Sequence, residues 1–242
     1  MKKVTIFFVV FCLPFMVMAQ SKNVMNSQRV FPKIGSTAAF EKALAAHSLK
    51  YHSSGNFKWR VYEITTGPDA GGYQILEGPC TWDEFDKRGD LGKEHMMNWA
   101  TTVTPLLTEK YEDSYVTYRD DLSSTGVTNY SNKIAISHVF NKPGYYGEME
   151  AAIKSLKSSW EDGKQNIAVY DISSSGEPGF VIVNRYADGL KERDAMYRSS
   201  MKSRYEKQNG AGSWSNYQDM LKKCIDHSWS EILEYRADLS AK

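Results

Sequence analysis

One internal repeat limits what this chain can fold into more than any other feature of its sequence. Residues 61–64, Val-Tyr-Glu-Ile, return as residues 169–172, Val-Tyr-Asp-Ile, and residues 118–123, Tyr-Arg-Asp-Asp-Leu-Ser, return as residues 235–240, Tyr-Arg-Ala-Asp-Leu-Ser. The first pair lies 108 residues apart and the second pair 117. Solenoid repeats are much shorter, at roughly 20–50 residues. The period therefore predicts a small domain that occurs twice.

The first nineteen residues have the pattern of a secretory signal peptide. Lys2 and Lys3 precede a mostly apolar stretch over residues 4–17, and Ala19 supplies the small residue that a signal peptidase needs. The apolar stretch is shorter than the ~20 residues of a membrane-spanning helix and contains Pro14. We expect cleavage after Ala19, export to the periplasm or the medium, and no membrane association of the mature protein.

The mature chain is close to electrically neutral. Loss of Lys2 and Lys3 changes the formal net charge from +1 to −1, and no later segment concentrates one sign. A nucleic-acid-binding surface calls for a basic patch or stripe. The sequence therefore predicts no nucleic-acid partner.

Both halves of the repeat predict the same order of elements. We expect a tail over residues 20–27, a first unit over 28–123, a linker over 124–132 and a second unit over 133–240. Hydrophobic periodicity and turn residues give each unit the order strand, helix, strand, strand, helix, strand. In the first unit the predicted strands are 28–34, 57–65, 72–78 and 113–120, and the helical stretches are 36–54 and 81–110. In the second unit the strands are 133–141, 166–173, 179–186 and 232–238, and the helical stretches are 144–162 and 188–230.

The order βαββαβ, given twice, indicates an α+β fold of two tandem ferredoxin-like units. In such a unit four antiparallel strands carry both helices on one face. The other face would be bare, yet strand residues on both faces are largely apolar, as in Ile134, Ala135 and Ile136. We therefore expect the two sheets to pack against each other, face to face.

This topology and repeat resemble the dimeric α/β-barrel superfamily, whose βαββαβ units pair between two chains or within one. The resemblance covers residues 28–239 and rests on no signature motif. The superfamily includes antibiotic-biosynthesis-type monooxygenases, haem-degrading enzymes, dye-decolourising peroxidases, chlorite dismutases and binding proteins without established chemistry. It therefore implies a place for a site, the cavity between the sheets, but not one function. It also implies a monomer, since one chain supplies both sheets.

Sharp catalytic and cofactor motifs are missing from the sequence. Residues 67–71, Gly-Pro-Asp-Ala-Gly, differ from the Gly-x-x-Asp-Gly of dye-decolourising peroxidases because the acid comes one place early, and we interpret them as a turn. The sequence has no His-x-x-x-His, Cys-x-x-Cys, phosphate-binding loop or Gly-x-Ser-x-Gly. No cofactor is predicted, with haem kept as an alternative.

Among the five histidines, His138 is the best candidate for a functional residue. It shares one face of a predicted strand with Ile134 and Ile136. If that face lines the cavity, its imidazole could transfer a proton or bind haem iron; the alternative is a hydrogen-bonded core residue. The other four histidines lie in predicted helical stretches and are interpreted as packing or surface residues: His47, His52, His95 and His227.

Charged residues also recur at equivalent strand positions. Glu63 matches Asp171, and Arg119 matches Arg236. These residues could form structural pairs across a sheet, or line a polar pocket for an anionic or aromatic ligand. Duplication favours the structural interpretation. The candidate cavity residues are His138, Arg60, Glu63, Arg119, Asp171, Arg185 and Arg236.

Each copy of the repeat holds one cysteine of the mature chain, at non-equivalent places. Cys80 and Cys224 could form a disulfide in an oxidising compartment, but two separate buried thiols are the favoured interpretation.

Three functions of different classes are compatible with the sequence. The first is an exported protein that binds a small apolar or aromatic ligand between its sheets. The second is a monooxygenase-like or haem-dependent enzyme, and the third is an interaction or structural module of the cell envelope. The missing catalytic motifs favour ligand binding without catalysis.

Overall fold

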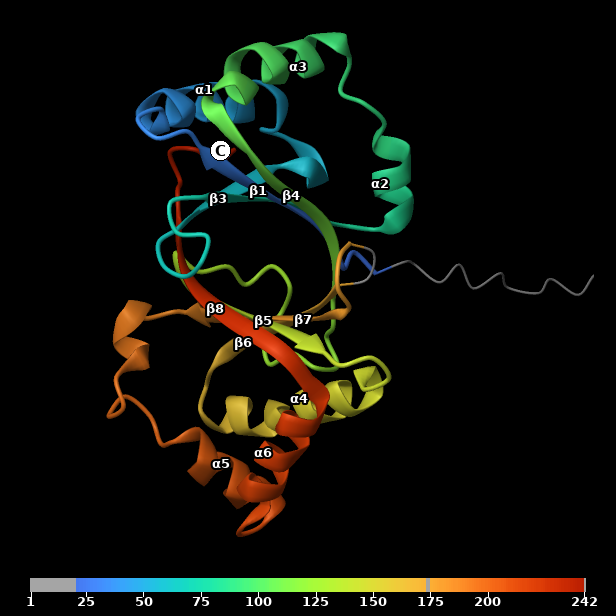
Figure 1. Cartoon of the computed structure of the whole chain (residues 1–242), viewed down its shortest axis with the longest axis vertical. Coiled ribbons are helices and arrows are strands. Elements are labelled where there is room, and N and C mark those ends of the chain that lie inside the picture. The colour runs from blue at the N-terminus through green and yellow to red at the C-terminus, as the bar shows by residue number, and fades with distance from the viewer. Residues whose placement is uncertain (1–20, 173–174, 242) are drawn as a thin grey trace, which may run out of the picture.

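The computed structural model describes residues 21–172 and 175–241, so the predicted signal peptide at 1–19 lies outside the described residues. The chain forms one closed barrel with the strand order β1-β3-β2-β8-β5-β7-β6-β4, and all neighbouring strands are antiparallel (Figure 1). The strands are β1 (Val24–Pro32), β2 (Trp59–Ile64), β3 (Tyr73–Cys80), β4 (Leu107–Tyr118), β5 (Lys133–Asn141), β6 (Asn166–Ile172), β7 (Gly179–Tyr186) and β8 (Ile225–Tyr235). The helices are α1 (Thr37–Tyr51), α2 (Trp82–Arg88), α3 (Lys93–Asn98), α4 (Tyr146–Asp162), α5 (Met201–Asn209) and α6 (Ser213–Cys224).

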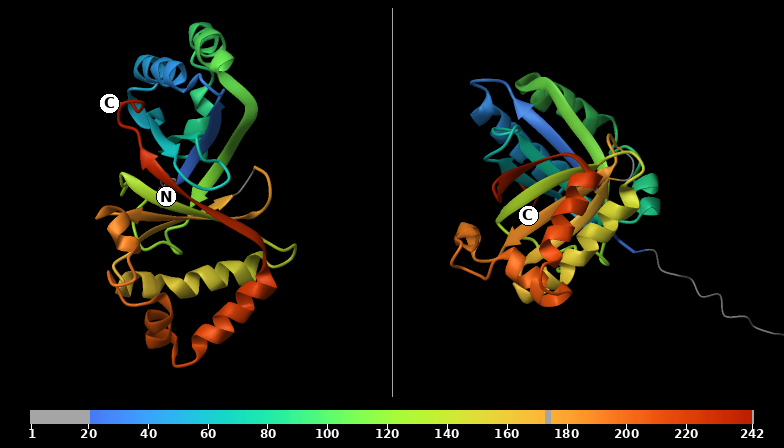
Figure 2. Two further views of the ribbon diagram at one scale, coloured as in Figure 1. Left: turned by 60° about the vertical axis from the view of Figure 1, so that its left-hand side comes forward. Right: turned by 60° about the horizontal axis from the view of Figure 1, so that its bottom comes forward.

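The helices cover the outside of the barrel on two opposite sides. Figures 1 and 2 show α1 and α3 on one side and α4, α5 and α6 on the other, with the strands between them. The first side is packed by Phe40 and Leu44, and the second by Met149 and Ile153. A third apolar cluster, which includes Ile134, fills part of the barrel interior.

The barrel closes through pairing between the two halves, which corrects the expectation of two sheets stacked face to face. β2 pairs with β8, where Ile64 lies opposite Leu233, and β4 pairs with β6, where Tyr118 lies opposite Tyr170. The apolar inner faces that suggested stacking therefore surround a common interior. Closure also pairs the strand edges that an open sheet would leave free.

Several element boundaries differ from those predicted. β1 begins at Val24, so part of the expected tail at 20–27 is strand, and β4 begins at Leu107 instead of 113. β8 begins at Ile225, where helix was predicted up to 230. The first parts of β4 and β8 are rich in exposed polar residues, which hides the alternation that identifies a strand. The long second helical stretches are each broken into two helices.

Each copy of the repeated motif, at 118–123 and at 235–240, packs against the opposite half of the molecule. After β4, Leu122 packs in the core of the second half and the Ser123 hydroxyl accepts a hydrogen bond from the Val169 amide at 2.9 Å. After β8, Leu239 packs in the core of the first half. In the same way, the Ser240 hydroxyl accepts from the Val61 amide at 2.9 Å.

The arginines of the repeated motif complete this exchange. Arg119 donates to Glu150 on α4 at 2.9 Å, and Arg236 forms an ion pair with Glu41 on α1. Figure 1 shows the C-terminal segment beside α1. We call the two sets the clasps: the first is Arg119, Leu122 and Ser123, and the second is Arg236, Leu239 and Ser240. Each clasp attaches one half to the other, which explains why this motif is the best preserved part of the repeat.

Cys80 and Cys224 are both buried, and both are free thiols. The structure therefore supports two separate thiols over the disulfide. Among the described residues, no helix combines the length and the apolar character needed to cross a membrane.

Candidate functional site in the barrel interior

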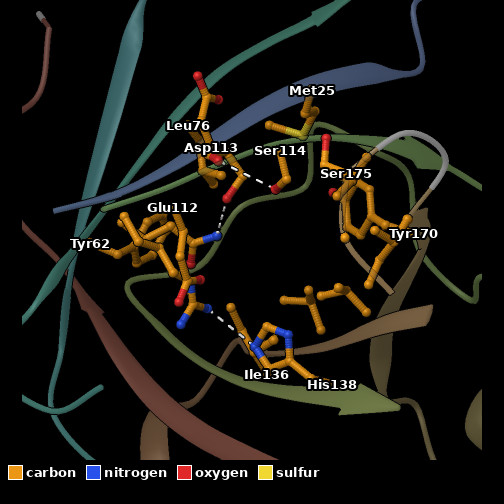
Figure 3. Close-up of a pocket in the computed structure, with 18 of the residues that line it drawn as sticks. Met25, Tyr62, Leu76, Glu112, Asp113, Ser114, Ile136, His138, Tyr170 and Ser175 are labelled. Carbon is orange, nitrogen blue, oxygen red and sulfur yellow. Dashed lines mark hydrogen bonds and ion pairs between the residues drawn. The ribbon is translucent and has the colours of Figure 1, made fainter. Parts of the chain in front are cut away.

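A cavity of about 670 Å³ occupies the barrel interior. All eight strands contribute to its wall, and Figure 3 shows His138 and Ile136 facing Met25, Ser114 and Ser175 across an open centre. Ligand pockets for small organic molecules span roughly 300–1,000 Å³. The cavity is therefore large enough for a molecule of several fused rings.

The middle of the cavity wall is apolar. Strand alternation turns every second side chain inward, and many of these are aliphatic. The apolar wall residues are Met25, Leu76, Val116, Ile134, Ile136, Ile172, Val181 and Val183. Such a wall favours an apolar or aromatic ligand because its burial removes apolar surface from water.

Arg29, which lines one part of the wall, belongs to a group of buried charged residues. The Arg29 guanidinium donates to the Asp69 carboxylate at 2.8 Å and also pairs with Glu231. The side chains of Arg29 and Asp69 are 5% exposed, and that of Glu231 is fully buried. We call Arg29, Asp69, Glu231 and His138 the buried ion cluster.

Asp69 reaches this cluster because the turn between β2 and β3 lies against β8. Gly67 has a φ of +91°, and a Cβ atom at this position would lie 2.9 Å from the Ser230 carbonyl oxygen. Only glycine accepts both the left-handed backbone and this close approach. Although burial acts to raise the pKa of Asp69, hydrogen bonds from Lys110 and Arg29 hold it below its usual range.

His138 is the member of the cluster that brings an imidazole to the cavity wall. Its Nε2 lies 3.0 Å from the Glu231 carboxylate and 3.1 Å from the Arg29 guanidinium. Burial lowers the pKa of His138, and the charge of Arg29 adds to this, while the hydrogen bond to Glu231 acts in the opposite direction; the net shift favours the neutral ring. The ring also stacks on Trp229 with a centroid separation of 3.8 Å.

The neutral ring has two tautomers. The partner of Nε2 determines whether Nδ1 is a hydrogen-bond acceptor or a donor. With a proton on Nε2, His138 donates to Glu231 and Nδ1 is a base. With the proton on Nδ1, Nε2 accepts from Arg29 and Nδ1 becomes a donor. His138 can therefore offer one hydrogen bond of either direction, and it can accept a proton.

The linker at 124–132 contributes Tyr130 to another part of the wall, and hydrogen bonds from Arg185 fix this segment. Arg185 donates to the main-chain oxygens of Gly126 and Asn129, both at 2.8 Å, and to the Tyr170 hydroxyl at 2.7 Å. Arg60 lies 3.7 Å above the ring of Tyr130 in the same linker. Both arginines therefore already have partners that fix the linker.

The structure brings only part of the predicted residue set to the cavity. His138 and Arg185 line the wall, and Arg60 contacts the wall residue Tyr130. The other four residues face the helices outside the barrel, contrary to the cavity interpretation: Glu63, Arg119, Asp171 and Arg236.

Strand alternation explains this placement. Tyr62 and Tyr170 point into the cavity, so the residues that follow them, Glu63 and Asp171, must point outward. Glu63 pairs with Arg236 at 2.9 Å, and Asp171 accepts a hydrogen bond from the Tyr146 hydroxyl. These contacts match the structural interpretation of the duplicated charges.

Sequence reasoning missed Arg29, Asp69, Trp229 and Glu231. Asp69 belongs to the turn that the sequence predicted, but its side chain is turned inward and buried. Trp229 fell at the end of a predicted helical stretch, and Glu231 fell between that stretch and the next predicted strand. Trp229, Glu231 and Leu233 follow one another at intervals of two, which is the alternation of a strand and the signal that could have located them.

Comparison with solved structures identifies the fold. No protein-family model and no curated protein sequence matches this chain. A candidate monooxygenase from Lactobacillus acidophilus NCFM superposes with a TM-score of 0.54 at 9% identity, covering 91% of this chain and 96% of that one. A candidate monooxygenase from Fusobacterium nucleatum subsp. nucleatum gives 0.56 at 13% identity, with coverages of 88% and 91%. An anthrone oxidase-like protein gives 0.54 at 12% identity, with coverages of 89% and 92%.

Identities this low show the fold and leave the function to the site. The superpositions cover both halves of the chain, in agreement with the resemblance that the repeat and the order of elements indicated. The chain shares its fold with these solved structures.

Proposed function

We propose that this protein binds one small, neutral, largely apolar or aromatic molecule inside its barrel, with a hydroxyl or carbonyl group of the ligand against His138. The observation that supports this most is the 670 Å³ cavity, whose apolar wall meets a neutral imidazole at the buried ion cluster.

The charges around the cluster favour a neutral ligand over an anion. The two cations, Arg29 and Lys110, face three carboxylates, those of Asp69, Glu112 and Glu231. Arg29 is thus already paired, and an added anion would meet the excess negative charge at low dielectric. This narrows the earlier expectation of an anionic or aromatic ligand to a neutral one.

Binding of a matched pair of probes tests this preference. Trp229 lies on the cavity wall, so quenching of its fluorescence reports occupancy. We expect 2-naphthol to bind at least about tenfold more tightly than 2-naphthoate, equivalent to about 1.4 kcal/mol. Ile136→Trp narrows the cavity beside His138 and should weaken binding by about tenfold or more, whereas Ile34→Trp, at a fully exposed position, should not. Equal binding of both probes, or unchanged binding in Ile136→Trp, contradicts the proposal.

A monooxygenase-like activity is a second candidate, favoured by the contact between His138 and Glu231. With Nε2–H donating to Glu231 at 3.0 Å, Nδ1 could take a proton from an acidic C–H or phenolic O–H of the bound molecule. The names of the structural neighbours fit this chemistry. Dioxygen uptake with hydroxylated polycyclic compounds, lost in His138→Ala, would support it. If such compounds bind without any dioxygen uptake, the monooxygenase-like activity is excluded and ligand binding is the remaining function.

Haem finds few free ligand nitrogens in the described cavity. The imidazoles on its wall are those of His138 and His227. Nε2 of His138 is held between Arg29 and Glu231, and both nitrogens of His227 face carboxylates, at 2.9 and 3.5 Å. Nδ1 of His138 is the nitrogen left for an iron in the cavity, and the proposal assigns this atom to the small ligand instead. We therefore expect haem titration of the purified protein to give no His138-dependent Soret band, and such a band would make haem the ligand.

The tandem origin, export and oligomeric state belong to the same proposal. Within the barrel, β4-β1-β3-β2 and β8-β5-β7-β6 are consecutive, which supports two ferredoxin-like units joined edge to edge. Export rests on the sequence of residues 1–19, and N-terminal sequencing should find Gln20 first. The closed barrel supports a monomer, and an obligate dimer in light scattering would contradict it.

A further inference from the structure

Three histidines meet outside the barrel, between α1 and α3. His47 lies on α1, His52 follows the last residue of α1, and His95 lies on α3. One possible ligand nitrogen of each lies within 4.8 Å of those of the other two. His47 and His52 are each 1% exposed, and His95 is partly open to solvent. We call these residues the trihistidine cluster.

The hydrogen bonds of His47 leave a metal-binding lone pair facing no partner. Nδ1 of His47 lies 2.8 Å from Oδ1 of Asn98, an oxygen that can only accept, so Nδ1 holds the proton. Nε2 therefore has the lone pair, and this buried atom has no hydrogen-bond partner among the described residues. A metal-bound histidine is commonly arranged in this way, with its other nitrogen fixed by a neighbouring acceptor.

His52 and His95 are already spaced as two ligands of one ion. Their Nε2 atoms are 3.2 Å apart. Tetrahedral coordination at a Zn–N distance of about 2.05 Å places ligand nitrogens about 3.4 Å apart. The ring of His52 is held in place by stacking on Trp59 at 3.6 Å, while His95 is on a six-residue helix at the surface. A rotation of the His95 side chain can therefore adjust the distances of its nitrogen from those of His47 and His52.

The surroundings keep these rings neutral, as ligation requires. Burial is the main reason that the pKa of each imidazole is lowered, for His52 to about 2. The nearby cation, Arg88, is paired with Glu77, its Nε lying 2.6 Å from a carboxylate oxygen, and Asp90 also faces His95.

The second half of the chain shows that the fold does not need histidines here. The repeat matches residues 40–44 to 149–153, which places Leu156 opposite His47 and Trp160 near the counterpart of His52. Leu156 and Trp160 pack with Tyr205 in an apolar core. An apolar interface between helix and barrel is therefore sufficient for this architecture, and three buried imidazoles in the other half call for a different explanation.

We propose that the trihistidine cluster is a binding site for a divalent transition metal, with Nε2 of His47, His52 and His95 as ligands and a solvent molecule in the fourth position. Three neutral imidazoles suit Zn²⁺, and also Co²⁺, Ni²⁺ and Cu²⁺, better than Mg²⁺ or Ca²⁺, which prefer oxygen. The partial exposure of His95 provides the open side. This site is separate from the barrel cavity and does not depend on the function proposed there.

The test uses the full mature chain, freed of metal with a chelator and titrated with Zn²⁺ in a calorimeter. We expect one equivalent to bind and Co²⁺ to give the visible spectrum of a tetrahedral site. His95→Ala should weaken Zn²⁺ binding by about 100-fold or more, and Asn98→Ala, which releases the Nδ1 contact of His47, by about 10–100-fold. His227→Ala is the matched control, because this half-exposed histidine lies outside the cluster. The His227→Ala protein should bind Zn²⁺ as tightly as the wild type does.

Two results would overturn the site. The first is wild-type protein that takes up no Zn²⁺. The second is binding that is equally tight in wild type and His95→Ala, which would place the ion elsewhere. His95 is partly exposed, so its replacement should leave the far-ultraviolet circular dichroism spectrum unchanged. If that spectrum does change, the Zn²⁺ titration of Asn98→Ala takes the place of the His95→Ala titration, and unchanged Zn²⁺ affinity in Asn98→Ala would then overturn the site.

Discussion

The two halves of the molecule share their backbone plan but differ at the places where polar side chains are buried. Between helix and barrel, the first half holds His47, His52 and His95, while the second half has an apolar core at the same place. The clasps, in contrast, make the same contacts in both halves. This difference indicates that the duplicated residues stabilise the fold. Buried polar residues that occur in only one half are not required by the fold and are therefore available to bind a ligand or a metal ion.

The barrel interior follows the same rule. Arg29 on β1 and His138 on β5 occupy matching positions, since they lie opposite Glu112 and Trp229 in strands that correspond to each other. Neither the residues nor their charges are repeated. The buried ion cluster therefore exists once in the molecule, and the pseudo-symmetry of the barrel does not require it.

The largest effect should come from removing one partner of the buried ion cluster. Arg29→Met leaves the carboxylates of Asp69 and Glu231 buried with less compensation, and we expect the free energy of unfolding to fall by about 3–5 kcal/mol. Adding Glu231→Met should restore most of the loss, because an apolar pair replaces the charges. Urea unfolding of both variants measures this. A double variant as unstable as the single one would mean that the cluster is part of the architecture after all.

The clasps should respond equally in the two halves. Leu122→Ala and Leu239→Ala each open a cavity at a side chain that is at most 2% exposed, and each should cost about 2–5 kcal/mol. Thermal and urea unfolding of the two variants gives the comparison directly. A loss confined to one of them would break the equivalence of the halves.

The sequence predicted the clasps as a motif but not what they do. The repeat gave the order of elements in both halves, and strand alternation gave the inward position of His138. Closure of the barrel depends on pairing between β2 and β8 and between β4 and β6, which are distant in sequence. Local patterns hold no information on such contacts.

The site was predicted in part, for reasons that lie in particular residues. Glu63 and Asp171 were kept as cavity candidates although their duplication favoured a structural role, and their neighbours Tyr62 and Tyr170 are the inward residues. The trihistidine cluster was not predicted at all. His52 lies just past the end of its helix, and His95 comes from a different helix, so neither spacing is that of a metal-binding motif.

A smaller effect should appear in the pH dependence of stability. The pKa of His138 is lowered in the folded protein by burial, whereas in the unfolded chain it is near 6.5. Below pH 6.5 the unfolded chain therefore binds a proton that the folded protein does not. Stability should fall with decreasing pH by up to about 1.4 kcal/mol per pH unit from this residue, until the pH reaches the folded pKa.

The matched variant for this effect is His138→Gln, which keeps a polar side chain beside Glu231 and Arg29. Its stability should fall less steeply than that of the wild type between pH 6.5 and 5.5, as urea unfolding at several pH values would show. Equal slopes would mean that the pKa of His138 is the same in the folded and unfolded protein, and a steeper fall in the variant would mean that His138 is protonated and pairs with Glu231 as an ion.

The smallest effect is expected where the halves differ most. His52→Phe keeps the stack on Trp59 and makes the first half more like the second, so the free energy of unfolding without metal should change by less than about 1.5 kcal/mol. Zn²⁺ should raise the melting temperature of the wild type and leave that of this variant unchanged. A large loss of stability without metal would assign the trihistidine cluster to the architecture.

The most direct test of the central claim is native mass spectrometry of the mature protein after incubation with 2-naphthol, with Ile136→Trp treated in parallel. The barrel cavity predicts a native mass that exceeds the denatured mass by one bound molecule in the wild type, and a smaller bound fraction in the variant. Equal bound fractions in the two proteins, or no excess mass in either, would contradict a binding site inside the barrel.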